Sequence, residues 1–252
     1  MKLESLIQYL GEYLAVAEHP DYPTALNGLQ VGGPQEVATV ATAVDASEAS
    51  IQEARGRGAD LMIVHHGLFW AGLRPLTGPH LRRVKALIEG GIALYSCHLP
   101  LDGHVEVGNS ALLARALGLE LDGRFASFQG ARVGWHGRPA QPLDLAGLLS
   151  RVETAVGGRV HVIAGGPERI DRVGVVTGGG ASFIEEASSL GLDALVTGEG
   201  PHHAHFDAME LGIHVLFGGH YATETLGVKA LGEHLAQRFD LTCAFIDQPT
   251  GL

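Results

Sequence analysis

The stretch EVATVATAVDASEASIQEARGRGADLMIVHHG, residues 36–67, decides the fold class of this chain. Within it, an apolar run leads into a helix-like pattern, and a second apolar run, LMIV, ends at His65 and His66. A further helix-like segment at 81–91 and a third apolar run at 92–102 follow. Strands that alternate with helices in this order predict β-α-β units and a mainly parallel sheet. The continuous apolar runs agree, because helices cover both faces of a parallel sheet.

The second half of the chain repeats this pattern. Residues 172–200, RVGVVTGGGASFIEEASSLGLDALVTGEG, align without a gap at an offset of 133, which pairs Asp60 with Asp193 (193 − 60 = 133) and His66 with Glu199. Seven of the 28 aligned positions from Val40 to Gly67 are identical. We therefore expect an α/β protein of two similar halves with mainly parallel sheets. Shared β-α-β construction without duplication is the alternative explanation of the match.

The residues between the two patterns have a different character. RFASFQGARVGWHGRPAQP, residues 124–142, combines glycine, proline and aromatic residues in short pieces, which predicts a hairpin and a connection. We therefore divide the chain into a first α/β half at residues 1–123 and a second half at residues 124–252. The C-terminal segment of the second half is in a position to pack back on the first.

The composition limits the class of protein and of partner. Of the 252 residues, 46% are apolar and 18% are charged, which is typical of an ordered globular chain. The formal net charge of −11 argues against a nucleic acid or an anionic membrane as the main partner. The two cysteines, Cys97 and Cys243, form no CxxC pair and exclude a site built from thiolates. These features favour a cytoplasmic protein with a small-molecule substrate.

The fourteen histidines gather with carboxylates where the apolar runs end. The carboxyl ends of parallel strands bind ligands, so we expect a metal site there, between the two halves. Imidazoles and carboxylates without a thiolate suit Zn, Fe, Mn or Co. Any one pair alone is more often a solvated pair or a helix cap, but the combined set is much stronger evidence. The polar groups at the four strand ends are His65–His66, His98–Asp102, Glu199–His202–His203 and His220–Glu224.

Five motifs in the same order and spacing resemble those of a known family. They are NGLQVG (27–32), HHG (65–67), HLPLD (98–102), TGEGPHH (197–203) and GHYATE (219–224). The chain resembles, over nearly its whole length, the dinuclear-metal proteins called GTP cyclohydrolase 1 type 2 homologues, the NIF-three-like family.

The resemblance implies a specific set of ligands for two divalent metal ions. His65 and His66 would bind different ions, Asp102 and His220 would each bind one, and Glu224 would bridge both. Family members form a toroidal homohexamer whose sites face an internal cavity, so the resemblance also implies self-association.

The chain departs from the family pattern in two places. Leu26 stands before Asn27, where members commonly carry an acidic residue. Some members also carry a large domain inserted in mid-chain, for which this sequence is too short. We therefore expect the compact form, and no acidic residue next to this motif is assigned a role.

A pair of divalent ions suits hydrolysis, because it polarises a phosphoryl or carbonyl oxygen. We therefore predict a metal-dependent hydrolase of a nucleotide, a phosphoester or a related small molecule. His98, Glu199, His202 and His203 are candidates for proton transfer, or for orienting a ligand of the metal. A non-enzymatic metal-binding protein with a regulatory or assembly role is the alternative. A Rossmann-like module is disfavoured, since no GxGxxG follows the first strand.

The ligand set predicts how substitutions change metal content. His65→Ala and Glu224→Ala should each lower the amount of bound metal measured by elemental analysis, because each removes a donor atom. The fold should be retained in both variants, as judged by circular dichroism. Full metal occupancy in both would exclude the site as described.

Overall fold

The computed structural model describes residues 1–252. They form nine α-helices, one short 3-10 helix and eleven strands, and the strands pair into two sheets. The chain folds as two compact units, residues 1–101 with 227–248 and residues 102–226 with 249–252. This architecture confirms the mixed α/β class that the alternating sequence pattern predicts.

The first unit contains a five-stranded sheet in the order β1-β4-β3-β2-β11. Only β1 runs antiparallel to its neighbour, so this sheet is mainly parallel, as expected. Its elements are α1 (Leu3–Tyr13), β1 (Gly28–Val31), β2 (Thr39–Asp45), α2 (Glu48–Gly56), β3 (Leu61–His66), α3 (Gly78–Gly90), β4 (Ala93–Ser96) and β11 (Thr242–Phe245). Two helices belong to both units, namely α4 (Leu99–Asp102) and α9 (His220–Phe239).

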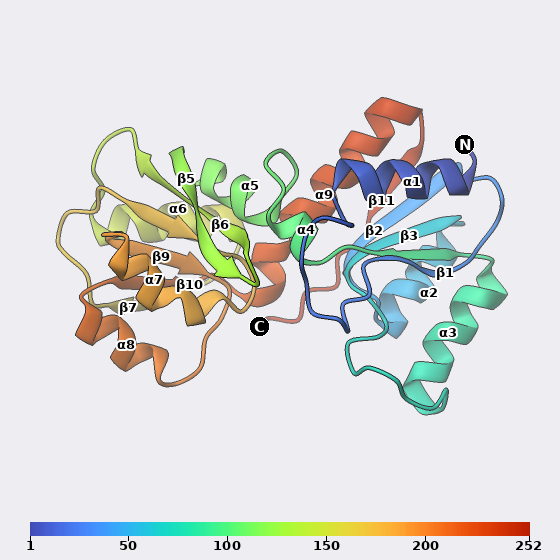
Figure 1. Ribbon diagram of the computed structural model, residues 1–252, viewed down its shortest axis with the longest axis horizontal. Helices are drawn as coiled ribbons and strands as arrows, with labels where there is room; N and C mark the ends of the chain where they lie inside the picture. Colours follow the sequence, from blue (N-terminus) through green and yellow to red (C-terminus); the bar gives the residue numbers. More distant parts are fainter. The chain divides into compact units, whose positions relative to one another are not determined.

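Helices cover both faces of this sheet (Figure 1). On one face, α1 packs beside the C-terminal part of α9, where the Tyr9 hydroxyl and Nε2 of His234 are 2.5 Å apart. On the other face lie α2 and α3, whose apolar side chains form one core cluster with β3 and β4. The first five residues of β3 are buried. The strand therefore reads as a continuous apolar run until its end at His65 and His66.

The second unit contains a six-stranded sheet in the order β5-β6-β8-β9-β10-β7. Helices α5 and α6 pack on one face of this sheet and α7 and α8 on the other (Figure 1). Its elements are α5 (Asn109–Ala116), β5 (Leu119–Phe128), β6 (Ala131–Pro139), α6 (Leu145–Val156), β7 (His161–Ala164), β8 (Val173–Val175), η1 (Gly180–Phe183), α7 (Ile184–Ser189), β9 (Ala194–Thr197), α8 (Ala204–Leu211) and β10 (His214–Phe217).

The expectation of mainly parallel sheets is wrong for this second sheet. Strands β8, β9 and β10 are parallel, but β5, β6 and β7 each add an antiparallel pairing. The cause at one edge is the hairpin expected within residues 124–142. Its two turn residues, Gln129 and Gly130, have φ values of +48° and +93°, and turns with two positive φ angles match the twist of paired strands. The expected boundary between residues 123 and 124 lies inside β5 of this hairpin.

Asp60 and Asp193, which the sequence alignment pairs, make corresponding hydrogen bonds. Oδ2 of Asp60 accepts from two consecutive backbone N–H groups beginning at Ala38, at 2.8 and 2.9 Å. Oδ2 of Asp193 accepts from two consecutive N–H groups beginning at Asp171, both at 2.8 Å. The donors are again 133 positions apart (171 − 38 = 133). Each carboxylate therefore ties the start of one parallel strand to the start of the next.

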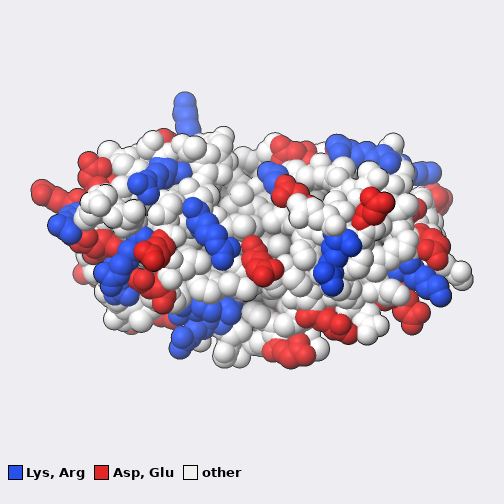
Figure 2. Space-filling view, turned by 90° about the horizontal axis from the view of Figure 1, so that it is seen from above, with Lys and Arg blue, Asp and Glu red and all other residues white.

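The charged side chains are interspersed on the face shown in Figure 2. Lysine and arginine alternate there with aspartate and glutamate and form no continuous basic patch. Such a surface offers little to a phosphate backbone, which binds clustered cationic side chains.

None of the nine helices combines the length and the apolar character needed to cross a bilayer.

Candidate metal centre

Three histidines of the first unit meet at the carboxyl end of its parallel strands. His65 and His66 are the last residues of β3, and His98 follows β4. The ring centroids are 4.7 Å apart for His65 and His66, 4.9 Å for His65 and His98, and 5.6 Å for His66 and His98. One nitrogen atom from each ring lies within 4.8 Å of the other two. The side chains of the adjacent histidines His65 and His66 can therefore point toward the same position, because the strand ends there.

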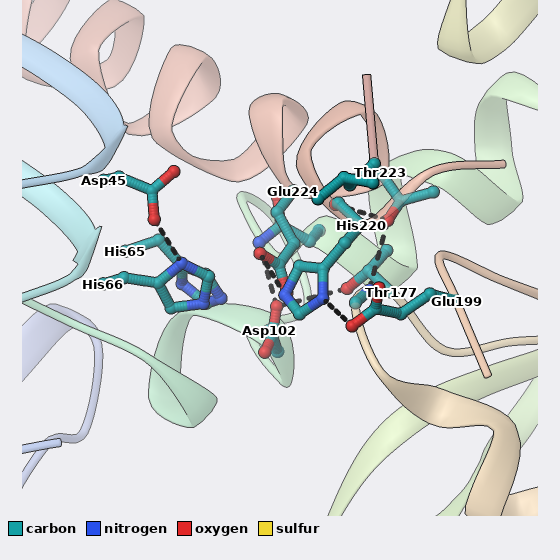
Figure 3. A network of polar contacts seen from close by, with 12 residues as sticks. Asp45, His65, His66, Asp102, Thr177, Glu199, His220, Thr223 and Glu224 are labelled. Atoms are coloured by element: carbon teal, nitrogen blue, oxygen red, sulfur yellow. Dashed lines mark hydrogen bonds and ion pairs between the residues drawn. The ribbon is translucent and has the colours of Figure 1, made fainter. Parts of the chain in front are cut away.

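Fixed acceptors orient the two histidines of β3. Nδ1 of His65 lies 3.0 Å from the backbone oxygen of Cys97, and Nδ1 of His66 lies 2.9 Å from Oδ1 of Asp45 (Figure 3). Asp45 is the residue paired with His66 in the register of β2 and β3. Carbonyl and carboxylate oxygens only accept, so Nδ1 carries the proton in both rings. The nitrogen that remains for a metal ion is Nε2.

His98 is held in the same way by a more deeply buried carboxylate. Its Nδ1 lies 2.9 Å from Oδ1 of Asp21, and Oδ2 of Asp21 accepts from the backbone N–H of Leu99 and from Nδ2 of Asn27. Burial of Asp21 opposes its ionisation, but the hydrogen bonds from His98, Asn27 and Leu99 outweigh it and lower its pKa. Asp21 is therefore an ionised carboxylate that fixes the tautomer of His98.

Asp21 supplies the acidic residue that is missing directly before the NGLQVG motif. The sequence places Leu26 directly before Asn27, and Asp21 stands five residues further upstream. Leu26 has a φ of +48°, so the backbone turns there and returns Asn27 to the carboxylate. Oδ1 of Asn27 then accepts from the N–H of His98 at 2.9 Å. Neither Asp21 nor Asp45 was predicted, although the strand register would have pointed to Asp45.

Gly67 and Gln30 close the backbone around the end of β3. The side-chain oxygen of Gln30 accepts from the N–H of Leu68 at 2.8 Å, and its Nε2 donates to the carbonyl groups of Ala25 and Leu26. A Cβ atom on Gly67 would lie 2.3 Å from the Gln30 side chain. Glycine after the two histidines therefore leaves room for the Gln30 side chain, which a larger residue would displace.

In the second unit, Asp102 is oriented by two neutral donors. Oδ1 of Asp102 accepts from Nδ2 of Asn109 at 2.9 Å and from the Thr177 hydroxyl at 3.2 Å. Asp102 is 6% exposed and Glu224 is 2% exposed, and one carboxylate oxygen of each lies within 4.8 Å of the other. Two carboxylates this close and this buried repel each other when ionised. A divalent cation removes that cost.

His220 lies between two carboxylates at the start of α9 (Figure 3). Its Nδ1 is 2.9 Å from Oε1 of Glu199, and its Nε2 is 3.2 Å from Oε2 of Glu224, one helical turn later. The hydrogen bond to Glu224 is the main cause that raises the pKa of His220 to about 9, with a further contribution from Glu199 and an opposing one from burial. The arrangement matches that of His66 and Asp45, with a carboxylate on Nδ1.

Glycines let the strand-end loops approach the first turn of α9. Gly178 has a φ of +65°, and a Cβ atom there would lie 2.1 Å from Oε1 of Glu224. A Cβ atom on Gly198 would lie 2.8 Å from Cα of His220. The N–H of Gly178 donates to the hydroxyl of Thr223 at 3.1 Å, which ties this loop to the helix. The segment TGGGAS, residues 177–182, therefore forms a tight turn that packs against the carboxylate of Glu224.

The donor set in each unit suits a divalent transition metal. Imidazole nitrogens and carboxylate oxygens are ligands of Zn, Fe, Mn and Co, and no cysteine sulfur is needed. An acceptor on Nδ1 of a ligating histidine is the usual support in metalloproteins, because it fixes the ring and increases its basicity. The residues present therefore fit metal ions.

Most of the site residues predicted from the sequence fall into two groups. His65 and His66 lie together with His98, and Asp102, His220 and Glu224 lie together in the second unit. Glu199 contacts His220 and acts through it. His202 does not join either group and lines a separate cavity.

Comparison with known proteins gives full-length matches. The Duf34/NIF3 (NGG1p interacting factor 3) family profile matches residues 1–251. A Deinococcus radiodurans protein named GTP cyclohydrolase 1 type 2 homolog is 43% identical, over 99% of this chain and 94% of its own. A solved structure described as "protein ybgI, unknown function" is 40% identical with a TM-score of 0.94 and covers 100% of both chains. TTHA1606 from Thermus thermophilus is 40% identical with a TM-score of 0.90 and the same coverage.

The contact between Gly178 and Glu224 yields a matched pair of variants. Gly178→Ala should lower the metal content and should also lower the free energy of unfolding by about 1–2 kcal/mol or more, because it adds a side chain at positive φ. Gly179→Ala should change neither quantity, since no atom lies within 4 Å of a Cβ there. Elemental analysis and denaturant unfolding measure the two effects. Equal metal content in both variants would contradict the assigned role of Gly178.

The raised pKa of His220 predicts that metal binding releases a proton. With a pKa of about 9, His220 is protonated at pH 7 in the metal-free protein. A metal ion binds only the neutral ring, so affinity should rise as the pH rises toward 9. Calorimetric titration with Zn in buffers of different ionisation enthalpy measures the released protons. His220→Gln should abolish the proton release that comes from His220. An unchanged proton release in the variant would refute the assignment of the released proton to His220.

Proposed function

Because the chain belongs to the Duf34/NIF3 family, we propose that it is a metal-dependent hydrolase of a nucleotide, a phosphoester or a related small molecule. Two divalent ions, Zn, Fe, Mn or Co, are its cofactors. The name of the relatives, GTP cyclohydrolase 1 type 2 homolog, supports a nucleotide among the candidate substrates. The proposed ligands are His65, His66, Asp102, His220 and Glu224.

One observation carries this proposal. Each of four histidines has a hydrogen-bond acceptor on Nδ1, and these acceptors come from four different segments of the chain. Three of them, His65, His66 and His220, are proposed ligands, and an acceptor on Nδ1 leaves Nε2 of each ring for an ion. On His98 the same support fixes the tautomer of a candidate for proton transfer.

The chain's own residues have separable tasks in such a hydrolase. When bound, the ions act as Lewis acids toward a phosphoryl or carbonyl oxygen. His98, with its tautomer fixed by Asp21, is placed to accept or donate a proton at Nε2. The indole ring of Trp70 contacts the His98 ring edge to face, with 4.6 Å between the ring centroids. The centroid of the Tyr22 ring lies 6.0 Å from that of His98. These rings limit the access of water to His98.

We also propose that the two groups of ligands arose at corresponding strand ends of two similar halves. The matching hydrogen bonds of Asp60 and Asp193 support this, as does the alignment of His66 with Glu199 at the same offset of 133 (199 − 66 = 133). In this proposal, each group of ligands lies at the carboxyl ends of strands in its own half, where parallel strands present their loops.

Exposed apolar side chains support self-association, with the homohexamer as the proposed form. Leu73 is fully exposed at 107%, and Leu76 and Leu26 are more than half exposed. Leu73 and Leu76 lie in the same loop before α3, and contiguous exposed apolar side chains commonly mark an interface between proteins. All three belong to the first unit.

The hydrolase is tested by restoring metal to the stripped protein and measuring turnover. Protein reloaded with Zn, Mn, Fe or Co should hydrolyse a member of a panel of nucleotides and phosphoesters. Glu224→Gln should lower the turnover about 100-fold or more, because it weakens a ligand. Glu153→Gln is the matched control, since Glu153 is an exposed glutamate of α6, and its turnover should equal that of the wild type.

Water bound to the ions distinguishes an enzyme from a non-enzymatic metal protein. A catalytic site keeps a position open to water, whereas a structural site is closed by protein ligands. Proton relaxation of water by the Mn-loaded protein should reveal exchangeable water at the ion. Bound Mn without exchangeable water and without turnover would support the regulatory or assembly role instead.

A further inference from the structure

A cavity lies in the second unit, at the carboxyl ends of β9 and β10. Its volume is about 560 Å³. Pockets for drug-sized ligands span about 300–1,000 Å³, and a cavity of this size is far larger than a single ion requires. The backbone from Gly198 to His202, which follows β9, forms one wall. The position is where parallel strands present ligand-binding loops.

Two flat rings form the floor of this cavity. Phe217 ends β10 and is the register partner of His161, the first residue of the edge strand β7. Their ring planes differ by 15° and their centroids are 6.0 Å apart, so the two rings lie parallel to each other as an offset stack. Ile163, two residues along β7 on the same face, extends the apolar floor. A planar aromatic ligand gains stacking energy on such a surface.

The loop that follows β9 lies directly against this floor. A Cβ atom on Gly200 would lie 2.8 Å from the ring of Phe217 and 2.5 Å from Cβ of Ala181. The glycine therefore lets the wall and the floor of the cavity meet without a gap. This close packing fixes the ring of Phe217 before any ligand arrives.

The polar groups of the cavity select the chemistry of its ligand. Glu199 is the one carboxylate among the lining residues, and no lysine or arginine lines the cavity. A phosphate group would find no lysine or arginine there, and the other polar side chains are the imidazoles of His161, His202 and His205. Glu199 only accepts hydrogen bonds, and one of its oxygens already accepts from Nδ1 of His220. A ligand with N–H donors complements the carboxylate, and an anionic ligand does not.

From this geometry we propose that the cavity binds a planar nitrogen heterocycle of purine size that carries N–H donors. The ring extends the stack formed by Phe217 and His161, and its N–H groups donate to Glu199. The assignment of this ring to the substrate of the hydrolase rests on the proposed function. The binding of a ring in the cavity does not depend on it. Glu199 then joins the two sites, because the same carboxylate contacts the ring and orients His220.

The fluorescent purine 2-aminopurine is a direct probe of this site, because stacking on aromatic side chains quenches its emission. Titration into the metal-loaded protein should give saturable quenching. Phe217→Leu and His161→Ala should each weaken binding about 5- to 10-fold, since each removes a stacking surface. Glu199→Gln should weaken it by a similar factor through loss of the acceptor. Caffeine, a purine without N–H donors, should compete more weakly than adenine.

The matched control is Phe245→Leu, which removes an aromatic ring from β11 in the first unit, outside the cavity. It should leave the affinity for 2-aminopurine unchanged. His161 lies on an edge strand, so His161→Ala keeps the test valid if Phe217→Leu does not fold. Absence of saturable quenching in the wild type, or equal affinity in wild type, His161→Ala and Phe245→Leu, would overturn the proposal.

The metal ligands separate this proposal from the hydrolase. Glu224→Gln and His65→Ala should lose metal and retain the affinity for 2-aminopurine, whereas His161→Ala should retain metal and lose affinity. Binding of the purine without any metal-dependent turnover would leave the ring site standing and remove the hydrolase. Turnover without purine binding would do the reverse.

Discussion

The hydrogen bond on Nδ1 of each site histidine is the constraint on which the candidate metal centre depends. An imidazole has two nitrogens, and without an acceptor either one can carry the proton while the ring turns about its side-chain bonds. Cys97 and Asp45 remove that freedom for the two histidines of β3. Asp21 and Glu199 do the same for His98 and His220. The remaining donor atoms are thereby set before a cation binds, so less ordering entropy opposes binding.

These acceptors are in place because backbone loops can approach one another closely at the strand ends. Glycine makes that approach possible at Gly67 and Gly178, where a Cβ atom would overlap Gln30 or Glu224. At Gly178 the positive φ adds a second reason, since L side chains avoid that conformation. The glycines of the HHG and TGGG motifs are therefore part of the site, although they contribute no donor atom.

Glu199 links the two proposed sites of the second unit. Its carboxylate fixes His220 and also lines the cavity floored by Phe217 and His161. A ligand that donates a hydrogen bond to Glu199 would reduce the negative charge available to His220. Binding of a ring and basicity of the histidine are therefore coupled through one side chain, with no movement of the backbone.

The sequence by itself determined the α/β class, the parallel core of the first sheet and the hairpin turn within residues 124–142. These features follow from local periodicity and from short-range turn chemistry. The antiparallel pairing of β7 with β10, the acceptor role of Asp21 and the fit of Gly178 against Glu224 were decided only by the tertiary structure. The physical reason is distance along the chain: Asp21 and His98 are 77 residues apart, and no local pattern specifies which distant groups will meet. Packing of the core brings them together.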